Sequence, residues 1–155
     1  MLAKYAGKHV LVTGGLGFIG SNLAIRLVEM GAHVNVIDSL ISESGGNPFN
    51  VSPVQSQIVI NNGDLRDSEL LVDAVAGKDF IFHLAGQVSH GDSMREPELD
   101  LGMNCISSLH LVEACRHHNP NARLVYTSTR QVYGVPQVLP VTERHPTLPI
   151  DVNGI

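Results

Sequence analysis

The chain is short of the features that mark several classes of protein. Its 155 residues include only two cysteines and 5% aromatic residues. No run approaches the roughly 18 uncharged apolar residues that a membrane span needs. The first fifteen residues carry glycines and charges where a signal peptide has its apolar stretch. We therefore expect a cytoplasmic protein that does not contact a membrane.

The two cysteines, Cys105 and Cys115, fall in one expected helix. Ten residues at about 1.5 Å each separate them by roughly 15 Å. Disulfides require Cα atoms within about 7 Å, so both are predicted to be free thiols.

Basic charge is also scarce. Ten Lys and Arg residues face fifteen Asp and Glu, which leaves a net charge of −5, and the basic residues are scattered. This pattern disfavours binding to nucleic acids or to anionic membranes. The length suits about one domain with a single core, which excludes a disordered tail and a large multidomain enzyme.

Short apolar runs alternate with helical patterns along the chain. Strands are expected at residues 8–13, 33–38, 57–61, 79–84 and 123–128, and helices within 17–31, 68–76 and 97–118. Residues 39–56, rich in Ser, Gly, Asn and Pro, are predicted to form a long flexible connection. The alternation predicts an α/β fold, a doubly wound parallel sheet of about five strands with helices on both faces. Its ligand would lie at the carboxyl ends of the strands.

A glycine-rich turn between the first strand and the first helix carries the strongest functional signal. The segment TGGLGFIG contains Gly14, Gly17, Phe18, Ile19 and Gly20. Glycines there allow the backbone to approach a pyrophosphate, whose charge is met by free amides and the helix dipole. The alternative is a purely structural turn, and a P-loop is disfavoured because no lysine follows the last glycine.

Asp38 supports the dinucleotide interpretation. It ends the second expected strand, 18 residues beyond Gly20, near the ~20 expected for the acid that binds a ribose hydroxyl. A carboxylate there would repel the 2′-phosphate of NADP, so NAD is the predicted cofactor.

Three further motifs follow the later strands: GDLRD at 63–67, HLAG at 83–86 and YTSTRQVYG at 126–134. Together with the glycine spacing they resemble the extended short-chain dehydrogenase/reductase family, and more narrowly its NAD-dependent nucleotide-sugar epimerases and dehydratases. The resemblance covers essentially the whole chain. It implies a Rossmann fold, transient oxidation of a sugar 4-hydroxyl by NAD, a nucleotide-sugar substrate and a homodimer.

The resemblance implies roles for residues around the cofactor. Asp64 and Leu65 match positions that hold the adenine, and Ala85 and Gly86 match the place where the chain passes the central part of the cofactor. The alternative for Asp64, and more so for Asp67, is a turn or helix cap.

The resemblance also implies roles near the substrate. Asn104 matches an asparagine close to the active site, and Thr129 matches the catalytic hydroxyl that hydrogen-bonds the reacting sugar oxygen. Taken alone, these two residues could equally be a helix-packing amide and a local backbone cap. Asn153 occupies the position of the usual catalytic tyrosine, and the chain carries no lysine after it. An amide cannot replace a phenolate as a base.

From these observations we expect residues 1–155 to be the truncated NAD-binding domain of a longer enzyme, without its carboxyl-terminal substrate domain. Such a piece would bind NAD without turnover. The alternative is a non-catalytic dinucleotide-binding sensor or scaffold, which Asn153 favours.

Two weaker signals remain. The histidines lack zinc-like spacing, so no metal site is predicted, and His83 in a buried strand is expected to be a hydrogen-bonded core residue. The helix at 97–118 carries Leu101, Ile106, Leu109 and Val112. It has more apolar residues than one core face requires, so these either pack on the sheet or, as in the resembling family, form a dimer interface. We expect exposed apolar surface there.

Overall fold

The computed structural model describes residues 4–42 and 44–155. Its elements in chain order are β1 (His9–Thr13), α1 (Phe18–Glu29), β2 (His33–Asp38), η2 (Pro48–Val51), η3 (Gln55–Gln57), β3 (Val59–Asn62), α2 (Ser68–Val75), β4 (Phe80–His83), α3 (His90–Arg95), α4 (Pro97–Leu101), the π-helical η4 (Gly102–Ile106), α5 (Ser107–His118), β5 (Arg123–Tyr126), η5 (Arg130–Tyr133) and η6 (Val152–Gly154).

The strands of the described residues form one five-stranded parallel sheet in the order β3-β2-β1-β4-β5. The chain steps outward from β1 to β3 and then crosses back to β4 on the other side of β1. The strand order therefore reverses between β1 and β4, and ligands bind at such a point in doubly wound sheets. The predicted fold class is confirmed.

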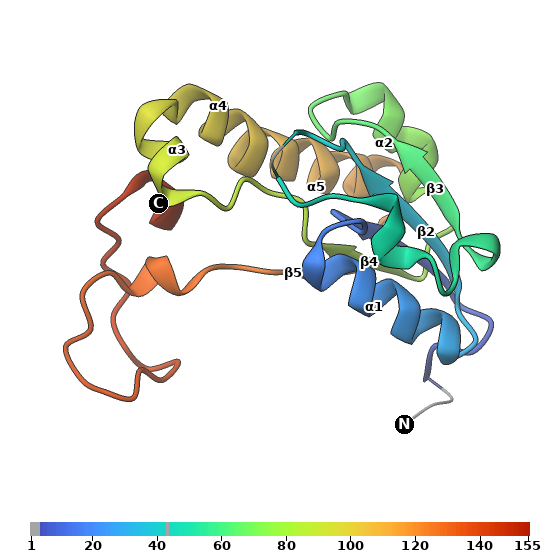
Figure 1. Cartoon of the computed structure of the whole chain (residues 1–155), viewed down its shortest axis with the longest axis horizontal. Helices are drawn as coiled ribbons and strands as arrows, with labels where there is room; N and C mark the ends of the chain where they lie inside the picture. Colours follow the sequence, from blue (N-terminus) through green and yellow to red (C-terminus); the bar gives the residue numbers. More distant parts are fainter. Residues whose placement is uncertain (1–3, 43) are drawn as a thin grey trace.

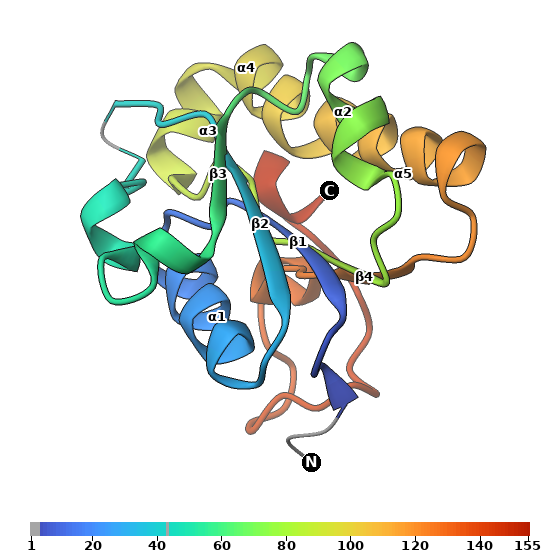
Figure 2. The same ribbon diagram turned by 90° about the vertical axis from the view of Figure 1, so that its right-hand side faces the viewer.

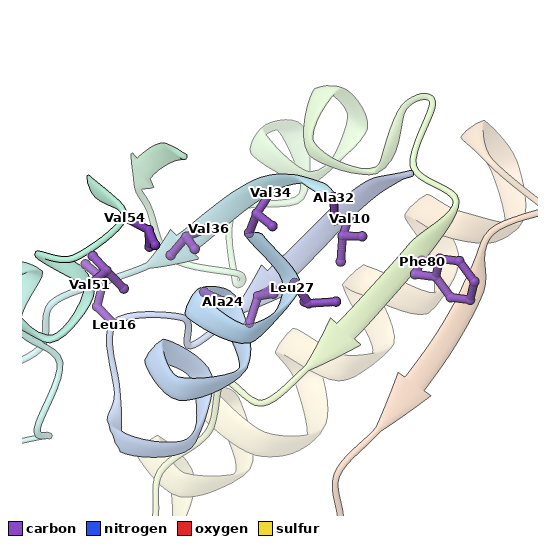
Figure 3. Packing of buried hydrophobic residues seen from close by; sticks show 11 residues of the cluster. Val10, Leu16, Ala24, Leu27, Ala32, Val34, Val36, Val51, Val54 and Phe80 are labelled. Carbon is purple, nitrogen blue, oxygen red and sulfur yellow. The ribbon is translucent and has the colours of Figure 1, made fainter. Parts of the chain in front are cut away.

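Helices cover both faces of the sheet. In Figures 1 and 2, α1 lies on one face, and α2 and α5 lie on the opposite one. Side chains of β1 alternate between these faces, so Val10 and Val12 join the cluster of Leu27, whereas Leu11 joins that of Leu111. Figure 3 shows the cluster on the α1 side. In the described part of the chain, no helix is long and apolar enough to cross a membrane.

The segment 39–56 differs from the expected flexible connection. It contains η2 and η3, and Val51 and Val54 are buried in the α1-side cluster (Figure 3). Asn47 caps η2 by accepting a hydrogen bond from Phe49 N–H. Burying each valine side chain contributes about 1.5–3 kcal/mol, and the backbone oxygen of Leu16 also accepts from Asn47 N–H and Asn50 Nδ2.

The chain between β4 and β5 is also more helical than predicted. The helix α3 was missed, although Ser89 caps it by accepting from Asp92 N–H, a pairing visible in the sequence as a serine followed three residues later by an acid. The expected helix at 97–118 is present, but the π-helical η4 interrupts it between α4 and α5. Such π segments occur frequently at functional sites.

Candidate functional site

A cavity of 710 Å³ opens at the carboxyl ends of the strands. This volume lies within the roughly 300–1,000 Å³ range of small-molecule sites. Every site residue predicted from the sequence contributes to its wall: Gly14, Gly17, Phe18, Ile19, Gly20, Asp38, Asp64, Leu65, Ala85, Gly86, Asn104, Thr129 and Asn153. The fold thus gathers residues from strand ends, loops and helices that lie far apart in the sequence around one space.

The glycine-rich turn forms one end of the cavity. Gly14 has a φ of +65°, and a Cβ added to it would lie 2.8 Å from the Cα of Ala85. A Cβ on Gly20 would lie 2.1 Å from the carbonyl oxygen of Gly14. Side chains at these positions would therefore force the turn away from α1 and from the end of β4.

The start of α1 faces this cavity with its first amides uncapped. Gly17 is the N-cap residue, and within the described residues no side chain accepts a cap hydrogen bond there and the first turn contains no acid. The N-terminal amides and the helix dipole together suit a phosphate group. The turn therefore fits the diphosphate of a dinucleotide.

Phe18 and Ile19 lie at the cavity and not in the core. Their exposed fractions are 84% and 66%. The face of α1 that is buried consists instead of Gly20, Ser21, Ala24 and Leu27. Small residues let the helix approach the sheet closely and leave both large apolar side chains beside the opening.

Asp38 is held at the cavity by two backbone amides. Its Oδ2 accepts from Leu16 N–H at 3.0 Å, and its Oδ1 accepts from Leu40 N–H at 3.0 Å. A carboxylate offers about four lone-pair sites. The group is therefore fixed in orientation and retains capacity for a ribose diol.

Asp64 is engaged by a neighbour. The Nε of Arg66 donates to both of its carboxylate oxygens at 3.0 Å, and the Arg66 N–H donates to Oδ1 at 2.9 Å. These hydrogen bonds from Arg66 lower the pKa of Asp64. The helix cap weighed for Asp64 belongs to Asp67, which accepts from Glu69 N–H at 3.0 Å. Leu65 is mostly buried in the core on the α2 side while also reaching the cavity.

Asn104, in η4, is almost fully hydrogen-bonded within the protein. Its Oδ1 accepts from Gln87 N–H at 2.8 Å, and its Nδ2 donates to Gln87 O and to Asp100 Oδ1, both at 3.2 Å. Both N–H groups of the amide are thus committed. A Cβ on Gly86 would lie 2.8 Å from Asn104 Oδ1, so glycine is needed beside it.

Thr129 and Asn153 also line the cavity. The Thr129 hydroxyl accepts from Gln131 N–H at 3.2 Å and so caps η5. Asn153 Nδ2 donates to the buried carboxylate of Asp100 at 3.4 Å. Asn153 Oδ1 is buried without a hydrogen-bond partner among the described residues.

Several supporting residues were not predicted from the sequence. Asp100 joins Asn104 and Asn153, and its spacing of four from Asn104 on a helix was the available signal. Asp151 accepts from Gly154 N–H at 3.0 Å and from Gln131 Nε2 at 3.2 Å. These contacts hold the last residues of the chain against the cavity.

His83 is a hydrogen-bonded core residue, as predicted. It is 2% exposed, and its ring nitrogens contact Thr13 Oγ1 at 2.7 Å and Ser108 Oγ at 2.9 Å. Burial lowers the pKa of His83 to about 4. The predicted free state of Cys105 and Cys115 is likewise confirmed.

A doubly wound sheet with a glycine turn after β1, an acid at the end of β2 and a cavity at the switch point defines the Rossmann class of dinucleotide-binding folds. Residues 11–152 match the family model described as GDP-mannose 4,6 dehydratase. The chain belongs to this family of NAD-dependent nucleotide-sugar epimerases and dehydratases, which confirms the resemblance.

Individual relatives agree. The UDP-glucose 4-epimerase of Corynebacterium glutamicum is 36% identical over 145 residues, covering 94% of this chain and 42% of that protein. The dTDP-glucose 4,6-dehydratase of Mycolicibacterium smegmatis is 36% identical over 129 residues, covering 81% of this chain and 38% of that protein.

Solved structures give the same picture. A UDP-N-acetylglucosamine 4-epimerase from Methanobrevibacter ruminantium, in complex with UDP-N-acetylmuramic acid, superposes with a TM-score of 0.86 at 34% identity, covering 96% of this chain and 46% of that one. The UDP-glucose 4-epimerase of Brucella ovis in complex with NAD gives 0.85 at 29% identity, covering 96% and 44%. The chain thus spans less than half the length of these relatives.

Proposed function

We propose that residues 1–155 are the NAD-binding domain of a nucleotide-sugar epimerase or dehydratase, and that this chain by itself binds NAD without turning a sugar over. The observation that carries the proposal is the uncapped start of α1 at a turn whose packing requires glycine, facing a cavity of 710 Å³. A carboxyl-terminal domain would supply most of the sugar contacts.

The cofactor contacts follow from the cavity wall. The amides at the start of α1 would donate to the diphosphate, and the Asp38 carboxylate would accept from the adenosine ribose. Leu65 would line the adenine, and Asp64 would accept from the exocyclic amine beside its Arg66 pair. Ala85 and Gly86, which carry little or no side chain, would allow close approach of the central part of the cofactor.

The reacting end of the cavity contains a hydroxyl and an amide. When bound, NAD supplies a hydride acceptor for the sugar 4-hydroxyl. The Thr129 hydroxyl would hydrogen-bond the reacting sugar oxygen. Asn153 occupies the position of the family's usual catalytic tyrosine, and its Nδ2 donates a hydrogen bond to Asp100. A carboxamide does not take up a proton at neutral pH, so proton abstraction at this position is not expected.

Calorimetric titration of this chain with NAD and with NADP tests cofactor binding. We expect NAD to bind and NADP to bind more weakly. Asp38→Ala should weaken NAD binding roughly ten- to a hundredfold, because hydrogen bonds to charged groups contribute about 1.5–3 kcal/mol, and it should reduce the discrimination between the two cofactors. Failure of the folded chain to bind either dinucleotide would overturn the proposal.

Turnover is tested separately. The chain is incubated with NAD and UDP-glucose, and the sugar is followed by proton NMR beside a complete UDP-glucose 4-epimerase as the positive control. No epimerised sugar and no dehydrated sugar are expected from the chain. Formation of either product would refute the absence of turnover while supporting the family chemistry.

A second candidate, a non-catalytic dinucleotide sensor or scaffold, is favoured by Asn153. Experiments on the longer protein distinguish the two candidate functions. A lysine four residues beyond Asn153 together with turnover supports the enzyme, and NAD binding without turnover by the longer protein supports the sensor.

In either case the exposed Leu101, Leu109 and Val112 are proposed to pair with a second copy in the longer protein.

A further inference from the structure

A buried side-chain row connects three elements beneath the cavity. Thr13 ends β1, His83 lies beside it at the end of β4, and Ser108 lies in the first turn of α5. Thr13 is completely buried and His83 nearly so. The row runs from Thr13 Oγ1 to His83 Nδ1 at 2.7 Å and from His83 Nε2 to Ser108 Oγ at 2.9 Å.

The Thr13 end of the row fixes one proton. Its Oγ1 accepts from Ala85 N–H at 3.2 Å and shares the N–H of Leu84, also at 3.2 Å, with its own backbone oxygen. A hydroxyl oxygen has two lone pairs. With both directed at amides, the hydroxyl proton is left to point at His83 Nδ1, which therefore accepts.

The Ser108 end leads independently to the same result. Ser108 Oγ lies 2.5 Å from the backbone oxygen of Asn104. A carbonyl oxygen only accepts, so the Ser108 proton lies between these two atoms. His83 Nε2 must then donate to Ser108 Oγ, which requires the proton on Nε2.

We propose that His83, held as the neutral Nε2–H tautomer, is a positioning residue that fixes the cavity wall formed by residues 84–87. The wall is held by hydrogen bonds at both of its ends. Thr13 holds the amides of Leu84 and Ala85, and the Asn104 side chain holds the N–H and C=O of Gln87. His83 joins these two ends because it ties β1 to the first turn of α5. The inference rests on the proposed function, since NAD would lie against this wall.

The space around this wall is too small to accept additional side-chain atoms. A Cβ on Gly14 would already lie 2.8 Å from Ala85, and one on Gly86 would lie 2.8 Å from Asn104. A shift of Ala85 by a few tenths of an ångström would therefore change the space between the glycine turn and β4. A doubly protonated His83 would have only donors, so Thr13 Oγ1 would face three donors and its own proton would lose its acceptor.

Nitrogen-15 NMR of the imidazole ring tests the assignment without any cofactor. In the unmodified chain at pH 7 we expect His83 to show one protonated nitrogen, Nε2, and one unprotonated nitrogen, Nδ1. Because each end of the row fixes the tautomer by itself, Ser108→Ala and Thr13→Val should each retain this single-tautomer signature, and only the combined substitution should remove it. A proton on Nδ1, or on both nitrogens, would overturn the proposal.

Calorimetric titration with NAD tests the positioning role. Thr13→Val removes the oxygen that accepts from Ala85 N–H, so the wall against which NAD would lie is held less firmly, and the Kd for NAD should rise about tenfold. Thr13→Ser keeps the hydroxyl and should stay within about twofold of the unmodified chain. Circular dichroism shows whether each variant is folded.

Should Thr13→Val fail to fold, Ser108→Ala serves as the second variant, because it removes no acceptor of a main-chain amide. We expect it to weaken NAD binding while Ser108→Thr preserves it. If the unmodified chain binds NAD and every folded variant binds it equally well, the positioning role is wrong. If the unmodified chain binds no NAD, the proposed function fails instead, and the tautomer measurement still decides the hydrogen-bond assignment.

Discussion

At the scale of single residues, the site depends on glycines at positions where a side chain would not fit. A Cβ on Gly20 would lie 2.1 Å from the oxygen of Gly14, so Gly20→Ala must displace the turn or the first turn of α1. We expect a loss of about 1–3 kcal/mol in unfolding free energy, typical of overpacking, together with loss of NAD binding. Urea unfolding and calorimetry measure the two effects.

Gly91→Ala is the matched control for this substitution. Gly91 lies in the helix α3, and a Cβ there would meet nothing within 4 Å. The variant should be as stable as the unmodified chain or slightly more so, because alanine favours the helix by up to about 1 kcal/mol. Equal effects of the two substitutions would contradict the steric account of the turn.

His83 predicts a pH dependence of stability. Burial lowers its pKa from 6.5 to about 4, so the unfolded chain takes up this proton more readily than the folded chain does. The contribution of the neutral His83 ring to the unfolding free energy is present in full above pH 6.5 and is lost as the pH falls toward 4. Between pH 7.5 and pH 4.5 the unfolding free energy should fall by about 2–3 kcal/mol from this group.

Urea unfolding at the two pH values, together with an NMR titration of the His83 ring, checks this expectation. Asp64 does not mask it, because hydrogen bonds from Arg66 lower the pKa of Asp64 below 3.8 and its contribution is lost only under more acidic conditions. A His83 ring that titrates near 6.5 would contradict the prediction.

The acids show how far single residues are predictable. Asp38 was found from its spacing to Gly20, because the geometry of a strand–turn–helix unit is local. The sequence did not decide whether Asp64 or Asp67 caps the helix that follows. The structure resolves it, since Asp67 accepts from the first amides of α2 while Asp64 turns to Arg66.

At the scale of elements, the helical run from α4 to α5 has two apolar sides. Leu111 and Ala114 face the sheet, whereas Leu109 and Val112 are 54% and 46% exposed. Packing on the sheet, one of the two alternatives for these side chains, is therefore wrong for Leu109 and Val112. The prediction of exposed apolar surface is confirmed.

We expect this face to cause self-association of the chain. The apparent mass in light scattering should rise with concentration, and Leu109→Glu combined with Val112→Glu should reduce it to that of a monomer. Val135→Glu, at an exposed position outside the helices, is the control and should not change the association. A strictly monomeric unmodified chain would refute this expectation.

At the scale of the whole molecule, the described cavity is built by the ends of all the parallel strands, so a ligand there should stabilise the entire fold. At an NAD concentration one hundred times its Kd, the gain is about 2.7 kcal/mol. For a domain of this size the Tm should rise by roughly 5–10 °C. Differential scanning calorimetry with and without NAD measures it.

Two controls accompany this measurement. NADP at the same concentration should raise the Tm less, because of the Asp38 carboxylate, and Gly20→Ala should show no NAD-dependent shift. A Tm independent of NAD in the unmodified chain would mean that the cavity does not bind the cofactor.

The sequence by itself determined the alternation of strands and helices, the glycine turn and the acid that follows β2. These features are set by local periodicity and by spacing within a single βαβ unit, which one segment of the chain encodes. The same holds for the family resemblance, which was carried by motifs at the ends of individual strands.

Tertiary structure alone decided the rest. It docked Val51 and Val54 against α1, joined Asp100 to Asn153 fifty-three positions along the chain, and aligned Thr13, His83 and Ser108 in one row. Such contacts depend on how elements distant in sequence come together in the packed protein. Their energies are set by burial and by which donors and acceptors remain free, and neither is defined until the sheet and its helices have assembled.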